Sequence, residues 1–595
     1  MIDYATLDAA VGQNWYDLDP DLQARVTHDC PTEDLDWATT TLHDFGELVG
    51  GRIARNADII DASPPQLSRY DKWANEINAI VHHPATLDSK AALWQAGYVS
   101  GFAADEKQRQ RTTPAVVLAA ANYLLSQADT GMVCSLGMTS GVAGLVESYA
   151  PPDVRDRLLD GLPASELDGG TDGSMFLTER DGGSDLGHTV HCTARDIGDG
   201  RVLIDGEKWF CSNIDGAAIV MLARPVGAPD GPGGLGLYLV PRELEDGSRN
   251  AISMRRLKPK LGTRSVPTGE VEFHGALGYA LRPQGQGQAQ GQAQGQGQGQ
   301  DAPITTSDAG GLNRMMEMVN GSRFGVAMMG LGIARRSFLE AVIWAHHRSA
   351  KGRLLVDLPL AREQLIDIQC ELEAAIALGF ECAAASRRDD GNRLRRILVP
   401  AAKNRLCRLG VEASSFAVEL HGGNGYCEDW GLTRQLRDAQ CHPIWEGSEN
   451  ICALDVLRAI RRDAAHEAVL ARIDQCLINA PSGPAFIAEA GEIIAASRKR
   501  LAAIINELPT FDADRVEAGA GKLTDLLNQT TAAALLLEQA TEGALDARKG
   551  LVALRYARRH LRPAEVWDDN IAFEAGRAML AYEPIDEQRA TKAAA

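Results

Sequence analysis

The sequence predicts a multidomain α+β protein in which a domain of antiparallel β-strands lies between helical domains. Three observations lead to this fold class. Apolar residues recur at helical spacing early in the chain, as in Leu42, Phe45 and Leu48. Short alternating runs broken by Gly, Pro and Asp follow from about 174 to 282. Helical spacing returns from Gly311 onward, and 595 residues are too many for one ordinary core.

These patterns divide the chain into five predicted parts. They are an N-terminal helical domain (1–173), a middle β domain (174–283), a Gln/Gly insert with its linker (284–310), a C-terminal four-helix-bundle domain (311–464) and an additional helical domain (465–595). Within the bundle domain, segments of helical spacing long enough for a bundle predict helices over 314–347, 360–386, 394–420 and 451–462.

The predicted β domain and the insert rest on local composition. Val202 and Ile204 alternate, Asp205-Gly206 predicts a hairpin turn, and a strand resumes at Lys208. Residues 284–300 contain only Gln, Gly and Ala. Such a segment buries too little apolar surface to offset its ordering entropy, so we expect a disordered inserted loop without a chemical role.

Composition limits the classes of function. The chain is 45% hydrophobic and 24% charged, which is typical of a soluble globular protein, and its net charge of −20 argues against a general affinity for phosphate backbones. No apolar run is long enough to span a bilayer, and the N-terminus carries no secretory pattern. The 11 scattered cysteines form no C-x-x-C pair, so we expect reduced thiols, no metal site and a cytoplasmic location.

One stretch, residues 440–450, places the carboxylate of Glu446 beside Trp445 and just before a predicted helix. Ser448 is a candidate N-cap for that helix. A carboxylate held against apolar surface has a raised pKa, which suits a general base. Taken alone, a Glu before a helix is more often a surface charge that complements the helix dipole.

Several separated motifs favour a catalytic role for Glu446 over that of a surface charge. They are Arg69-Tyr70-Asp71, the 178–185 stretch Thr-Glu-Arg-Asp-Gly-Gly-Ser-Asp, Lys208-Trp209-Phe210, the 260–265 stretch Lys-Leu-Gly-Thr-Arg-Ser, and the 444–448 stretch Ile-Trp-Glu-Gly-Ser. In this order, over roughly residues 60–462, the chain resembles the acyl-CoA dehydrogenase family and most of all its AidB-type branch. The resemblance implies the helical, β and bundle domains of that fold, with FAD as cofactor.

The resemblance assigns flavin contacts to the β domain. Thr178 and Ser184 would bind flavin through their hydroxyls, and Ser184 also borders the acyl-CoA tunnel. Phe210 would pack on the isoalloxazine and Ser212 would donate toward its N5, although Trp209 comes one residue earlier than in many members. Alone, the Gly-Gly-Ser-Asp turn and the aromatic strand have common structural explanations.

A second group of contacts would serve the FAD of a neighbouring subunit. Arg348 would hold the adenine end, helped by Gly422 and Gly423. Lys351 replaces a family Phe and Glu419 a family Gln, which puts the exact adenine contacts in doubt. Ser448 and Asn450 stand where the family has Thr and Gln, which also contact FAD.

The acyl-CoA channel would be lined by Asn320, Ser322 and Arg323, with Asn320 replacing a family Asp. Glu446 would remove the α-proton of the thioester while the β-hydrogen leaves as hydride. The thioester oxygen would be polarised by the Glu446 backbone N–H and a flavin ribityl hydroxyl, since an enolate-like charge needs donors fixed in advance. The implied partners are acyl-CoA, an electron-transfer flavoprotein and further copies of the chain in a homodimer or homotetramer.

Two other functions compete with this one. The first is an AidB-like flavoprotein of the alkylation-stress response that protects DNA or detoxifies alkylating chemicals. From residue 465 onward the chain carries 15 Lys and Arg against 19 Asp and Glu, a net −4, so DNA binding is expected to be weak or absent. The second is membrane docking of the C-terminal helices, for which Ala-rich helices of mixed charge are poorly suited.

Overall fold

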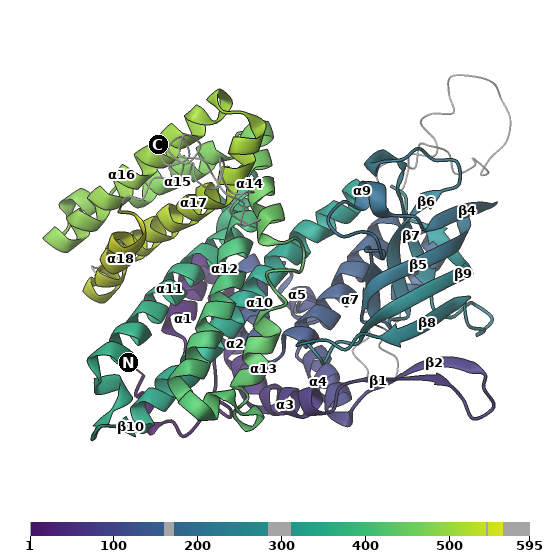
Figure 1. The fold of residues 1–595 in the computed structure, drawn as a ribbon, viewed down its shortest axis with the longest axis horizontal. Helices are drawn as coiled ribbons and strands as arrows, with labels where there is room; N and C mark the ends of the chain where they lie inside the picture. The colour runs from purple at the N-terminus through teal and green to yellow at the C-terminus, as the bar shows by residue number, and fades with distance from the viewer. Residues whose placement is uncertain (1, 160–171, 284–310, 389, 543–545, 563–595) are drawn as a thin grey trace, which may run out of the picture.

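The computed structural model describes residues 2–159, 172–283, 311–388, 390–542 and 546–562. The predicted insert therefore lies outside the described residues. A β domain lies beside a large body of helices, and the last helices pack at the far end of that body (Figure 1). This is the predicted fold class, although the structure does not test the exact domain bounds. No helix in the described ranges is long and apolar enough to cross a membrane.

The N-terminal part is helical with one β-hairpin. The helix over Leu35–Leu48 carries apolar residues at the predicted helical spacing and buries Leu42 and Phe45. The helices are α1 (Pro20–Asp29), α2 (Leu35–Leu48), α3 (Ala54–Ala62), α4 (Pro84–Gln95), α5 (Ala103–Arg109), α6 (Ala115–Ala128), α7 (Thr130–Tyr149) and α8 (Pro152–Leu159). The hairpin of β1 (Gln66–Tyr70) and β2 (Glu76–Val81) was not predicted. It lies against β8 (Figure 1), where Asn78 Nδ2 donates to Ile252 O at 3.3 Å.

The middle domain is a seven-stranded sheet whose pairings close into a ring. Its path is β3-β6-β4-β5-β9-β7, with β7 returning to β6 and β8 added on β9; β6 runs parallel to β3 and β4, and the other pairs are antiparallel. The strands are β3 (Gly173–Phe176), β4 (Thr193–Gly198), β5 (Arg201–Ser212), β6 (Ala218–Pro225), β7 (Gly236–Pro241), β8 (Ile252–Leu257) and β9 (Thr268–Ala280), with the short helix α9 (Leu186–Thr189) after β3.

The predicted hairpin at Asp205-Gly206 is wrong. Strand β5 continues through both residues, and its register against β9 shifts between Ile204 and Asp205. Gly206 has φ 136°, and a Cβ there would lie 2.7 Å from Cys192 Sγ. The Asp-Gly pair therefore provides a bulge and a close approach to Cys192, directly before β4, which the same two residue types can also support.

The bundle helices follow the predicted spacing closely. They are α10 (Gly311–His347), α11 (Pro359–Ala384), α12 (Gly391–His421) and α14 (Glu449–Asp463), with the short pair β10 (Ser349–Ala350) and β11 (Arg353–Leu354) after α10 and helix α13 (Leu432–Ala439) before α14. Ser448 occupies the N-cap position of α14, but its hydroxyl makes no cap hydrogen bond, so the predicted capping contact is wrong.

The additional helices pack on the bundle rather than standing apart. They are α15 (His466–Cys476), α16 (Ala485–Glu507), α17 (Ala513–Thr541) and α18 (Ala547–His560). Leu527 and Leu535 of α17 belong to the same buried apolar cluster as Leu406 of α12. Arg472 of α15 adds polar contacts, since its Nε donates to Glu381 Oε1 at 2.8 Å and its Nη1 to Glu538 Oε1 at 2.6 Å.

Candidate active site

Glu446 lies in the tight loop between α13 and α14. The backbone of Glu446 has φ 55°, a conformation that residues other than glycine rarely adopt, and Gly447 follows with φ 102°. Arg323 of α10 supports this geometry because its Nε donates to Glu446 O at 3.0 Å, while its Nη1 pairs with Asp455 Oδ2 at 2.7 Å. Strained backbone held by surrounding contacts is frequent at functional sites.

A buried lysine holds the same loop from α12. Lys403 is fully buried, and its Nζ donates to Pro443 O at 3.1 Å and to Gly447 O. The two carbonyls flank Glu446 in the chain. The buried charge is thereby satisfied by hydrogen bonds, and the loop is fixed on both sides of the carboxylate.

The surroundings of Glu446 favour its neutral form. Burial raises the pKa of Glu446 to about 7, although Arg323 and Lys403 act in the opposite direction. Nearby His442 is fully buried and neither ring nitrogen has a hydrogen-bond partner in the described structure. Burial, with Lys403, lowers the pKa of His442 to about 3, so this ring is neutral and adds no charge beside the loop.

The β domain brings Thr178, Phe210 and Ser212 together. Trp209 N donates to Thr178 O at 2.9 Å, which joins the loop after β3 to the end of β5. Phe210 is 55% exposed, and Lys258 Nζ lies 4.8 Å from its ring centre. The exposed Phe210 ring, with Lys258 beside it, is accessible for contact with a ligand.

A buried ion pair sets the conformation of this loop. Lys208 Nζ donates to Glu179 Oε1 at 2.7 Å and to Leu177 O at 3.1 Å. Glu179 also accepts from the backbone N–H of His191 at 2.7 Å and of Cys192 at 3.1 Å. Burial acts to raise the pKa of Glu179, but Lys208 and these backbone donors outweigh it and hold the pKa below its usual value.

The segment 258–268 links the β domain to the Glu446 loop. Ser212 Oγ lies 3.0 Å from Thr268 Oγ1, and Lys260 Nζ donates to that same oxygen at 3.2 Å. Thr263 of the same segment donates its backbone N–H to Asp438 Oδ1 of α13, the helix that precedes the Glu446 loop. Ser212 and Glu446 therefore lie on one seam between the β domain and the helices.

Arg348, Gly422 and Gly423 occupy a different, exposed corner. Trp344 stacks on His421 with ring centres 4.7 Å apart, and the Arg348 guanidinium lies 5.9 Å from the Trp344 ring. These contacts gather the three residues where α10 and α12 end. Helix α12 separates this corner from Lys403 by about 27 Å at 1.5 Å per residue.

The other predicted residues lie on three separate segments. Ser184 is exposed on the loop before α9, and Ser448 and Asn450 are exposed at the start of α14. Ser322 is partly buried on α10, directly before Arg323. Asn320 belongs to the same helix, but its side chain lies outside the described residues.

Lys403, Lys260 and Asp455 were not assigned roles from the sequence. Lys403 interrupts a buried run of α12, between Ala402 and Leu406. A lysine on the apolar face of a helix is rarely buried without a partner, and that is the signal by which it could have been noticed. Its partners are backbone carbonyls, which no sequence pattern identifies.

Comparison with known proteins agrees with this architecture. Residues 174–276 match the family model of the acyl-CoA dehydrogenase middle domain, 309–461 that of the acyl-CoA dehydrogenase C-terminal domain, and 7–169 that of the adaptive response protein AidB N-terminal domain. The chain is 32% identical to the AidB protein of Escherichia coli (strain K12), over 76% of this chain and 79% of that protein.

Two further likenesses extend to the C-terminal helices. Acyl-CoA dehydrogenase family member 11 of Caenorhabditis elegans is 25% identical over 91% of this chain and 87% of that protein. The crystal structure of Caenorhabditis elegans ACDH-11 in complex with C11-CoA covers 98% of this chain and 97% of that one, with a TM-score of 0.85 and 24% identity. The chain therefore belongs to the acyl-CoA dehydrogenase family of flavoprotein oxidoreductases, and within that family to the AidB-like branch.

Proposed function

We propose that the chain is an FAD-dependent dehydrogenase of acyl-CoA thioesters in which Glu446 is the catalytic base. The observation that carries this proposal is the Glu446 carboxyl, whose pKa is raised to about 7 by burial in a loop held by Arg323 and Lys403. A general base works best when its pKa is near the working pH. Membership of the family supplies the reaction class.

The residues of the seam fit an FAD. Phe210 presents an exposed ring for a flavin face, and the hydroxyls of Thr178, Ser184 and Ser212 offer hydrogen bonds to its polar atoms. A Cβ added at Gly183 would meet nothing within 4 Å, so the backbone there is open to a close approach by a ligand.

In the proposed reaction, the carboxylate of Glu446 takes the α-proton of the acyl-CoA. The FAD, when bound, supplies the acceptor for the β-hydrogen, which leaves as hydride. The backbone N–H of Glu446 is the chain's own candidate donor to the thioester oxygen, where negative charge develops. Arg323 and Lys403 hold the backbone carbonyls of this loop, and Asn320, Ser322 and Ser184 would contact the acyl-CoA. Electrons would then pass to an electron-transfer flavoprotein.

The purified protein is expected to be yellow, with near one FAD per subunit, and to be a dimer or larger. Arg348, Gly422 and Gly423 are exposed far from the seam, and Gly422 and Gly423 leave open space where a Cβ would project. This corner is suited to contact the FAD of a second copy of the chain. Ser448 and Asn450 are suited to contact the FAD bound by their own subunit. Flavin absorbance measures the FAD content, and sedimentation velocity measures the oligomeric state. A flavin-loaded monomer would contradict the proposed role of Arg348, Gly422 and Gly423.

The rate of flavin reduction by an acyl-CoA should rise with pH through about 7 and then level off. The sign follows because Glu446 accepts a proton only when it is ionised, and its pKa lies near that value. Anaerobic stopped-flow measurement of flavin bleaching, below and above this pH, gives the profile. A rate independent of pH across that range would speak against Glu446 as the base.

The match to the AidB N-terminal domain favours one alternative, a role in the alkylation-stress response. The arginines of the C-terminal helices argue against strong DNA binding in that role, because ion pairs already occupy five of them. These are Arg498 with Asp474, Arg555 and Arg559 with Asp367, and Arg558 and Arg562 with Glu489. Duplex binding needs several free cations to contact phosphates.

A further inference from the structure

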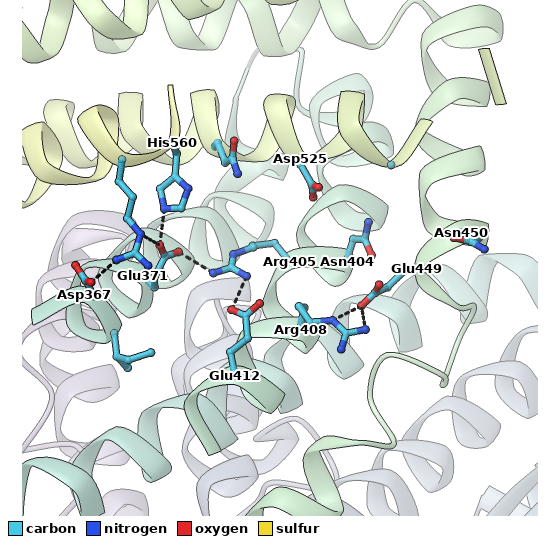
Figure 2. Close-up of a pocket in the computed structure, with 14 residues that line it drawn as sticks. Asp367, Glu371, Asn404, Arg405, Arg408, Glu412, Glu449, Asn450, Asp525 and His560 are labelled. Carbon is cyan, nitrogen blue, oxygen red and sulfur yellow. Dashed lines mark hydrogen bonds and ion pairs between the residues drawn. The ribbon is translucent and has the colours of Figure 1, made fainter. Parts of the chain in front are cut away.

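Polar side chains line a cavity of about 560 Å³ between the bundle and the additional helices, which Figure 2 shows. Arginines and carboxylates of this lining pair with each other. Arg405 donates to Glu371 at 2.7 Å and to Glu412 at 2.8 Å, and Arg408 Nε donates to Glu449 at 2.7 Å. A ligand there would have to compete with these bonds. The seam, in contrast, offers a hydroxyl hydrogen that no described residue accepts.

This hydrogen belongs to a pair of hydroxyl groups, Ser212 and Thr268, which lie opposite each other where β5 ends and β9 begins. Their oxygens are 3.0 Å apart, and either hydroxyl could donate the hydrogen of this bond. A hydroxyl has only one hydrogen, so the group that accepts keeps its own hydrogen for another partner. The direction of this bond therefore decides whether Ser212 meets a ligand as a donor or as an acceptor.

Lys260 occupies one side of the Thr268 oxygen. Its Nζ donates to Thr268 Oγ1 at 3.2 Å and to the carbonyl oxygens of Thr263 at 2.6 Å and Val266 at 2.7 Å, while Thr263 Oγ1 is farther away at 3.4 Å. Burial lowers the pKa of Lys260, and hydrogen bonds to three oxygen acceptors favour its charged form. An ammonium carries donors only, so the Thr268 oxygen accepts from Lys260.

The hydrogen of the Thr268 hydroxyl has one acceptor left. Thr268 is 6% exposed, and among the described residues its hydroxyl contacts only Lys260 and Ser212. A buried hydroxyl without an acceptor is costly, so the Thr268 hydroxyl donates to Ser212 Oγ. Ser212 therefore accepts in this pair, and its own hydrogen has no acceptor in the part of the chain that the structure describes.

The hydrogen of Ser212 lies on a side of β5 that a ligand can reach. Cys211 is fully buried, whereas Phe210 is exposed and Ser212 is only partly buried. Successive side chains of a strand point to opposite faces, so Phe210 and Ser212 share the outer face. A ligand stacked on the Phe210 ring would thus meet the donor of Ser212.

We propose that Thr268, held by Lys260, is a positioning residue that fixes Ser212 as a hydrogen-bond donor to N5 of the oxidised flavin. This inference rests on the proposed function, because it takes FAD as the ligand of the Phe210 face. N5 of an oxidised flavin has a lone pair that accepts a hydrogen bond, whereas N5 of a reduced flavin carries a hydrogen. A serine fixed as a donor therefore favours the oxidised cofactor, although Thr268 itself does not touch it.

Thr268→Val tests this role, since valine has nearly the shape of threonine but no hydroxyl. We expect oxidised FAD to bind about 10-fold more weakly, the effect of losing one hydrogen bond, as measured by the release of fluorescent FAD on dilution of the loaded protein. Reduced FAD should lose little affinity. The midpoint potential of the bound flavin should therefore rise by about 30 mV, which corresponds to 10-fold for a two-electron couple.

Three further variants identify the hydroxyl as the cause. Thr268→Ser keeps the hydroxyl and should restore both values. Ser212→Ala should weaken FAD binding to a similar degree, and combining it with Thr268→Val should weaken it no further, because both changes remove one hydrogen bond. Thr530→Val is the matched control, since Thr530 and Ser497 form a buried hydroxyl pair at 2.7 Å between α17 and α16. It should leave both values unchanged.

An unchanged potential in Thr268→Val, additive losses in the double variant, or an equal loss in Thr530→Val would overturn this inference. So would a Thr268→Ser variant that behaves like Thr268→Val. A wild type that binds no FAD would overturn the proposed function and this inference together, whereas a wild type and a Thr268→Val that bind FAD equally would overturn this inference alone. Melting temperatures close to that of the wild type distinguish a loss of binding from a loss of folding.

Discussion

Glu446→Gln is expected to lower the rate of anaerobic flavin reduction by a good acyl-CoA by at least ~100-fold, in line with a lost general base. Glutamine keeps the shape of the side chain and its capacity to form hydrogen bonds, but it cannot accept the α-proton. Flavin content and melting temperature should stay near wild type, because Arg323 and Lys403 hold the loop through backbone carbonyls and not through the Glu446 carboxylate.

Glu449→Gln provides a matched control for this experiment. It makes the same chemical change three residues later, at a carboxylate that pairs with Arg408. This variant should reduce its flavin at close to the wild-type rate. Equal bleaching rates in wild type and Glu446→Gln would remove Glu446 from the mechanism.

A duplex-binding assay at moderate salt separates the two candidate functions. If the protein acts as an acyl-CoA dehydrogenase, the wild type and Glu446→Gln should bind DNA equally weakly. Strong duplex binding by both, with no bleaching of the wild type by any chain length, would favour the alkylation-stress role instead.

The order of helical and β domains could be predicted because it depends on periodicity. Helices α10, α11, α12 and α14 each present apolar residues at helical spacing over many turns, and their observed bounds lie within a few residues of the predicted ones. The rise in the pKa of Glu446 could also be anticipated in direction, since Trp445 adjoins it and apolar surroundings disfavour a charged carboxylate. Both inferences use information that is local in the chain.

What could not be predicted depends on contacts between distant segments. The β1–β2 hairpin is short, its residues are half-exposed, and its pairing with the β domain joins residues about 170 positions apart, such as Asn78 and Ile252. The role of Lys403 depends on carbonyls some 40 residues away. At Gly206, the residue types allow both a turn and a bulge, and the pairing of β5 with the distant strand β9 decides between them.

Lys208→Met is expected to cost ~3–5 kcal/mol of stability, because removing one member of a buried ion pair leaves the other charge uncompensated. Lys208 is 1% exposed and Glu179 3% exposed, so water cannot replace the lost partner. The melting temperature should fall on the order of 10 °C. Flavin content should fall with it, since this pair fixes the loop that carries Thr178.

Two further variants identify the cause of that loss. Lys208→Met combined with Glu179→Gln removes both charges and should recover part of the melting temperature. Arg558→Met breaks an ion pair with Glu489 that is half-exposed, and should cost no more than about 1 kcal/mol. Calorimetry and flavin absorbance on all three variants separate a buried uncompensated charge from a general effect of losing a cation. If Lys208→Met melted like Arg558→Met and kept its flavin, the Lys208–Glu179 pair would have no special part in holding the cofactor loop.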